Sequence, residues 1–136
     1  MGTKCANVPE HTFRVVWLAL ILARMEGVKN EEKIIKIALV HDLAEARTGD
    51  LNPIFKAYTR TDEEKAVREM LQNTGLEDFY GKYFREYNIR GSKEAKIVKD
   101  ADMLDVELEL LEMEEKGSKL AEKARAFRKK IRRVRE

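Results

Sequence analysis

The two histidines of this chain lie where they could hold a metal ion together with nearby carboxylates. His11 lies on the first apolar run, His41 is followed directly by Asp42 on the second, and Asp102 lies within a third. Imidazole nitrogens and carboxylate oxygens that converge from separate helices make a mixed ligand set suited to a divalent transition metal. The four side chains therefore predict a site for one such ion, and Mn, Fe, Co, Ni and Zn are all compatible with it.

Glu45 is the candidate for proton transfer beside that ion. It follows His41 by four residues and Asp42 by three, so on a helix it projects from the same face as both. A carboxylate one turn away from a metal can move a proton to or from a water molecule or a leaving oxygen. Asp50, which follows Gly49 in the next loop, is a second candidate, and the alternative is that it only caps that loop.

Three aspartates could supply the carboxylate from the helix that we expect over residues 92–116. The apolar stripe of this helix consists of Ile97, Ala101, Leu104, Leu108 and Leu111. Asp102 lies on one flank of the stripe with Asp105 beside it, whereas Asp100 lies on the opposite flank. Spacing alone permits any of the three to be the ligand.

Arg14 is the candidate for contact with a substrate phosphate. It follows His11 by three residues and would emerge near the same face of the first helix, where a guanidinium group can bind phosphate oxygens. A salt bridge to a neighbouring carboxylate is the alternative interpretation. We expect Trp17, further along the same helix, to lie in the core.

The elements that must carry these residues read as helices throughout. Pro9 fits a first helical turn, Gly27 ends the segment that follows, and Asn30 is a good N-cap for the next. The first segment is apolar on several faces, as is typical of a central helix. We therefore predict an all-α bundle of about six helices, with helices over residues 9–26, 30–45, 61–74, 92–116 and 118–135 and a short aromatic segment over 77–87.

Composition indicates one folded domain. The chain has 136 residues, 43% of them apolar, and only two prolines, so we expect a single domain over 1–136 with its core at about 9–116. Cys5 is the only cysteine and cannot form an internal disulfide, which favours a reducing, cytoplasmic location. The apolar run 15–23 is too short to cross a bilayer and no signal peptide precedes it, so no membrane partner is expected.

The segment 118–135 is predicted to form a basic amphipathic helix. Residues 118–136 contain nine basic and two acidic residues, a net charge of +7, while the rest of the chain has 18 basic and 23 acidic residues, a net charge of −5. Such a helix could bind nucleic acid or attract an anionic substrate. We favour the simpler interpretation, in which its apolar stripe docks against the acidic body, so a nucleic-acid partner is not expected.

Three motifs together resemble a known family. They are PEHTFRV at 9–15, VHDLAE at 40–45 followed by Gly49-Asp50 and Pro53, and VKDADML at 98–104. The pattern is similar to the H…HD…D signature of the HD-domain phosphohydrolases, and most similar to their 5'-deoxynucleotidase branch. This resemblance, rather than spacing, selects Asp102 as the fourth metal ligand beside His11, His41 and Asp42. Asp105 is then a residue that supports a ligand or packs helices.

The resemblance also implies a reaction. A water molecule activated by the metal would attack the phosphorus of a deoxynucleoside 5'-monophosphate, with Glu45 as general acid for the departing 5'-oxygen and Asp50 near the phosphate and sugar. Relatives are commonly homodimers, and we expect one here, because the first helix and an aromatic cluster at 79–87 (Phe79, Tyr80, Tyr83, Phe84 and Tyr87) offer much apolar surface. Relatives also carry an Arg-Trp pair ahead of the first histidine, and residues 1–10 contain neither.

The alternatives to this function are hydrolysis of a cyclic nucleotide or a nucleoside triphosphate, or a nucleic-acid-binding module led by the basic helix.

Overall fold

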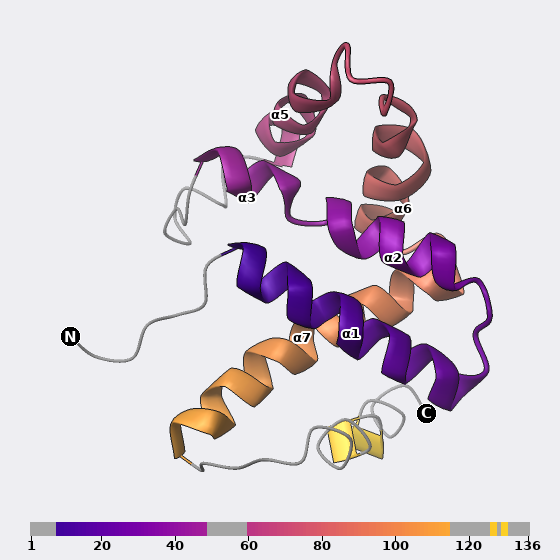
Figure 1. The fold of residues 1–136 in the computed structure, drawn as a ribbon, viewed down its shortest axis with the longest axis vertical. Coiled ribbons are helices and arrows are strands. Elements are labelled where there is room, and N and C mark those ends of the chain that lie inside the picture. Colours follow the sequence, from indigo (N-terminus) through magenta and orange to yellow (C-terminus); the bar gives the residue numbers. More distant parts are fainter. Residues whose placement is uncertain (1–7, 49–59, 115–125, 128, 131–136) are drawn as a thin grey trace.

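The computed structural model describes residues 8–48, 60–114, 126–127 and 129–130 (Figure 1). Its elements are α1 (Val8–Glu26), α2 (Glu31–Val40), α3 (Leu43–Thr48), α5 (Arg60–Leu71), the π-helical segment η1 (Tyr80–Phe84), α6 (Arg85–Ile89) and α7 (Lys93–Glu114). All regular structure in the described residues is helical. The prediction of an all-α fold is confirmed.

The core lies where α1 meets α2 and α7 (Figure 1). Helix α1 packs against both, and its side chains Leu18 and Leu22 are buried together with Ile37 of α2 and Leu104 of α7. Each fully buried aliphatic side chain contributes about 1.5–3 kcal/mol relative to exposure to water. The central position expected for the first helix is therefore correct.

The outer face of α1 differs from expectation. Trp17 is 54% exposed and Phe13 is 65% exposed, and the two rings meet edge to face with their centroids 6.4 Å apart. The expectation that Trp17 lies in the core is wrong, because α1 presents its buried stripe through Val15, Leu18 and Leu22 and leaves the Trp17 side to solvent.

The helix expected over 30–45 is broken in two. It begins as expected, since the Asn30 side chain accepts a hydrogen bond from the backbone N–H of Lys33 (3.1 Å). However, α2 ends at Val40, and α3 begins only at Leu43. Nδ1 of the His41 ring donates to the carbonyl oxygen of Ala38, which in a continuous helix would accept from the amide four residues later. The histidine side chain thus occupies the acceptor that the next turn would need.

A smaller apolar cluster joins the remaining helices. Val40 and Ala44 pack with Val67 and Leu71 of α5 and with Phe84 of η1. The chain then turns into α7, where the Ser92 hydroxyl accepts a hydrogen bond from the backbone N–H of Ala95 (3.1 Å). This contact agrees with the helix start predicted at residue 92.

Most of the basic segment 118–135 lies outside the described residues, and the domain limits 1–136 and 9–116 stay a prediction. Within it, Ala126, Phe127, Lys129 and Lys130 are helical, Phe127 is buried in the main core, and Nζ of Lys130 lies 3.5 Å from Oε1 of Glu107. These contacts agree with a docked helix. None of the described helices is long and apolar enough to cross a membrane.

Candidate metal centre

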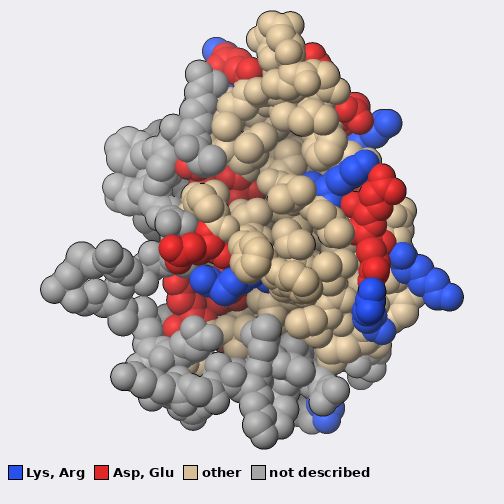
Figure 2. All heavy atoms as spheres, viewed as in Figure 1, with Lys and Arg blue, Asp and Glu red and all other residues tan. Residues whose placement is uncertain are grey.

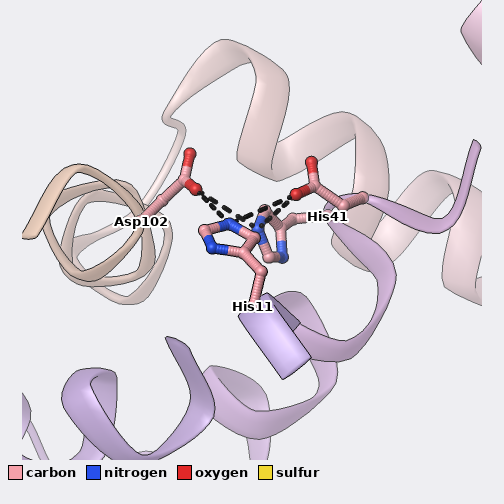
Figure 3. A group of neighbouring side chains, drawn as sticks. His11, His41 and Asp102 are labelled. Carbon is pink, nitrogen blue, oxygen red and sulfur yellow. Dashed lines mark hydrogen bonds and ion pairs between the residues drawn. The ribbon is translucent and has the colours of Figure 1, made fainter. Parts of the chain in front are cut away.

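The structure brings His11, His41, Asp42 and Asp102 to one point. Figure 3 shows the side chains of His11, His41 and Asp102 pointing toward one another. One nitrogen or oxygen atom from each lies within 4.8 Å of the corresponding atoms of the others. His11 comes from the first turn of α1, His41 and Asp42 from the turn between α2 and α3, and Asp102 from the middle of α7. Three separate segments thus supply two imidazoles and two carboxylates.

The distances place both Nε2 atoms against the same two carboxylates. Nε2 of His11 lies 2.7 Å from Oδ1 of Asp102 and 3.3 Å from Oδ2 of Asp42. Nε2 of His41 lies 3.3 Å from the same Asp42 oxygen and 3.7 Å from the same Asp102 oxygen. The four atoms therefore surround a small shared space, which is the arrangement that a single cation requires.

The other nitrogen of each ring is already occupied. Nδ1 of His11 donates to Oδ2 of Asp105 (2.7 Å), and Nδ1 of His41 donates to the carbonyl of Ala38. Because carboxylate and carbonyl oxygens only accept, both Nδ1 atoms carry the proton and both Nε2 lone pairs are available once neutral. Among the described residues, the buried Nε2 of His41 has no hydrogen-bond partner. Burying an unsatisfied polar atom costs free energy, and a bound metal would remove that cost. The residues fit a divalent transition metal.

Asp105 holds both His11 and Arg14. It is 1% exposed, and its two oxygens accept from Nε (2.6 Å) and from the second guanidinium nitrogen of Arg14 (3.0 Å). Arg14 also lies 3.8 Å from Glu109. The structure thus shows the salt bridge that the sequence left open as the alternative for Arg14, and it gives Asp105 the supporting position expected of it.

Charges in the cluster stabilise one another. Burial opposes a positive charge on His11, but hydrogen bonds with Asp102, Asp105 and Asp42 outweigh it and raise its pKa to about 11. For His41, burial is likewise outweighed by Asp102 and Asp42, and the pKa rises to about 9. Burial works to raise the pKa values of Asp42 and Asp102, yet the two histidines hold both well below the usual range. Without a cation, protons on the imidazoles therefore balance the carboxylates.

A pH-dependent effect of metal on stability follows. The pKa values of both histidines are raised above 6.5, so their contribution to stability in metal-free protein is complete below pH 6.5 and is lost as pH rises through about 9 and about 11. Metal binding needs neutral Nε2 atoms, so the stabilisation that the metal provides increases as pH rises. We expect the increase in Tm caused by Mn²⁺, measured by calorimetry against a chelator-treated sample, to be larger at about pH 8.5 than at about pH 6.

An equal increase in Tm at the two pH values would contradict this expectation. The carboxylates do not obscure the comparison, because the pKa values of Asp42 and Asp102 are lowered from 3.8 and their contribution is lost only on stronger acidification.

The remaining predicted residues lie elsewhere or outside the described residues. Asp100 is buried, but it lines a hollow of about 590 Å³ between the start of α7 and the α1–α2 connection. Glu45 is in the first turn of α3, half-buried, and is not among the four clustered residues. The break at His41 removes the premise that Glu45 shares one continuous helix with the histidine. Asp50 lies outside the described residues.

Tyr87 and Lys99 were not predicted as site residues. The Tyr87 hydroxyl donates to Oδ2 of Asp102 (3.0 Å), and Nζ of Lys99 lies 3.5 Å from the same oxygen. The spacing of Lys99 three residues before Asp102 could have indicated its contact. For Tyr87 the sequence offers only membership of an aromatic cluster.

Comparison with known proteins gives a consistent result. The family profile described as HD domain matches residues 2–136. The 5'-deoxynucleotidase HDDC2 of Danio rerio is 34% identical over 114 residues, covering 80% of this chain and 56% of that protein. The 5'-deoxynucleotidase HDDC2 of Dictyostelium discoideum is 34% identical over 130 residues, covering 86% of this chain and 67% of that protein. The chain thus spans little more than half the length of the first relative.

A solved structure is also similar. A conserved hypothetical protein from Pyrococcus furiosus is 33% identical, with a TM-score of 0.68 over 94% of this chain and 81% of that one.

Proposed function

Because this chain belongs to the HD domain family, we propose that it is a metal-dependent phosphohydrolase that converts deoxynucleoside 5'-monophosphates to deoxynucleosides and phosphate. The observation that carries the proposal is the convergence of His11, His41, Asp42 and Asp102 from three segments. The named relatives supply the substrate class.

The metal is one divalent transition ion, of Mn, Fe, Co, Ni or Zn, held by these four side chains. When bound, it offsets phosphate charge and makes a water molecule more acidic. The surface argues for such a cation. Figure 2 shows acidic side chains gathered on the side where α1 begins, with a basic side chain among them. A phosphate dianion approaching this side would be repelled without a positive charge in the cluster.

Glu45 and Asp50 are the proposed reacting carboxylates. As the oxygen of water bonds to phosphorus, the bond from phosphorus to the 5'-oxygen breaks and Glu45 donates a proton to that oxygen. In support, Glu45 lies in the first turn of α3, and its backbone N–H donates to the carbonyl of Asp42 (3.0 Å). Contact between Arg14 and the phosphate stays a prediction. It would compete with Asp105, which accepts hydrogen bonds from two guanidinium nitrogens of Arg14.

The test is a phosphate-release screen of deoxynucleotides, cyclic nucleotides and nucleoside triphosphates against each of the five metals. We expect metal-stimulated release from deoxynucleoside 5'-monophosphates. Release mainly from another phosphoester would keep the enzyme class and change the substrate. Tight binding to nucleic acid that weakens steeply with salt, without any turnover, would favour a nucleic-acid-binding module instead.

A homodimer is the proposed assembly. The exposed rings of Phe13 and Trp17 support it, since large exposed apolar patches usually mark partner surfaces. The aromatic cluster of 79–87 gives less support than expected, because Phe84 and Tyr87 are buried inside the protein. We expect light scattering at micromolar concentration to give twice the chain mass of 15.8 kDa. A mass near 15.8 kDa that added metal leaves unchanged would show a monomer.

The cytoplasmic location also stays a prediction.

A further inference from the structure

The carboxylate of Asp102 is engaged at both oxygens. Oδ1 faces the candidate ion position, 2.7 Å from Nε2 of His11 and 3.7 Å from Nε2 of His41. Oδ2 points to a different set of groups, accepting a hydrogen bond from the Tyr87 hydroxyl (3.0 Å) with Nζ of Lys99 3.5 Å away. A carboxylate whose outer oxygen is held in this way cannot turn to exchange its two oxygens without losing that hydrogen bond.

Tyr87 also contacts the second histidine. Its ring meets the His41 ring edge to face, with centroids 5.2 Å apart, and the tyrosine is only 8% exposed. One side chain therefore touches two of the four candidate ligands, which come from different segments. Lys99 is the weaker contact, because it is more exposed and its charge is screened by water.

The local structure fixes where Tyr87 lies. It lies in α6, which follows the π-helical segment η1 directly, and Phe84 at the end of η1 is fully buried. The preceding residue, Glu86, accepts a hydrogen bond from the Ser92 hydroxyl (3.0 Å) and pairs with Lys33 (2.8 Å). Short π-helical turns occur often at functional sites, because the added residue changes the direction of the side chains that follow.

We propose that Tyr87 is a positioning residue of the metal centre. Its hydroxyl fixes which oxygen of Asp102 faces the ion, and its ring fixes the orientation of His41. The inference rests on the proposed metal-dependent function, but it concerns a residue outside the four-residue ligand set.

The test is Tyr87→Phe, which removes one oxygen atom and keeps the ring. Tyr80→Phe is the matched control, because the Tyr80 ring stacks on Phe84 and not on a candidate ligand. The dissociation constant for Co²⁺ is measured with a competing chelator, the visible absorption of the Co²⁺-loaded protein reports ligand geometry, and circular dichroism reports the fold. We expect Tyr87→Phe to bind Co²⁺ about ten- to a hundredfold more weakly with an altered spectrum. Tyr80→Phe should match the wild type.

Lys99→Met gives a second measurement if Tyr87→Phe does not fold. Under the proposal the Tyr87 hydroxyl holds Oδ2 without help, so Lys99→Met keeps the Co²⁺ dissociation constant within about threefold of wild type. A tenfold loss with Lys99→Met would assign the role to the lysine and overturn the proposal. Equally weakened Co²⁺ binding in Tyr87→Phe and Tyr80→Phe would also overturn it, because both substitutions would then act through a general destabilisation of η1 and α6.

The outcomes separate this inference from the proposed function. If wild-type protein binds no Co²⁺, the metal-dependent function itself fails. If wild type and Tyr87→Phe bind Co²⁺ equally well, only the role of Tyr87 fails. Weaker Co²⁺ binding by Tyr87→Phe, with no phosphate release from any nucleotide, would support the role of Tyr87 while removing the substrate assignment.

Discussion

Replacement of His41 or Asp42 by alanine is expected to abolish metal binding and phosphate release together. Each substitution removes one of four proposed ligands. The loss of His41 also removes the ring N–H from which the Ala38 carbonyl accepts a hydrogen bond. The metal content of purified protein and phosphate release by the same sample are the two measurements. Stoichiometric metal in His41→Ala would refute the ligand assignment.

The parallel experiment compares three aspartates on one helix. Asp102→Ala should lose the metal, whereas Asp100→Ala should retain it, because Asp100 lines a different hollow. Asp105→Ala should weaken metal binding less than Asp102→Ala, since Asp105 acts on Nδ1 of His11 and not at the shared ligand point. Metal loss in Asp100→Ala or Asp105→Ala but not in Asp102→Ala would overturn the choice of Asp102.

Glu45→Ala is expected to keep the metal and to lose about 10²–10⁴-fold in turnover, the usual effect of removing a general acid or base. The measurements are kcat at saturating metal and the metal content of the same sample. Glu10→Ala is a suitable control, because Glu10 is an exposed carboxylate in the first turn of α1, next to His11. A wild-type rate in Glu45→Ala would remove this residue from the mechanism and transfer the role to Asp50.

The fold class and the clustering of four side chains could be predicted from the sequence, because both follow from helical spacing, helix caps and short motifs. Helical spacing and N-caps such as Asn30 depend on local chemistry. Spacing alone left Asp100, Asp102 and Asp105 equivalent. The crossing of α1 over α7 distinguishes them, because it sets Asp102 against Nε2 of His11 and Asp105 against Nδ1.

Contacts made across the fold could not be predicted in the same way. The end of α2 depends on one ring nitrogen of His41 reaching the Ala38 carbonyl, which periodicity does not encode. The exposure of Trp17 depends on which stripe of an apolar helix faces its neighbours, and residue type does not decide this. Tyr87 reaches Asp102 from a position three residues after a π-helical turn, and sequence reasoning described that segment only as short and aromatic.

The ligand set joins residues that are far apart along the chain, and this has a consequence for folding. His11 and Asp102 are separated by 91 positions, and the turn after α2 lies between them. An ion shared by all three segments would act as a reversible cross-link, and closing so long a loop gains more than closing a short one. None of the three segments could then detach without releasing the ion. Hydrogen exchange at amides of α1, the α2–α3 turn and α7 should therefore give one common free energy of opening in metal-loaded protein, and separate values after chelation.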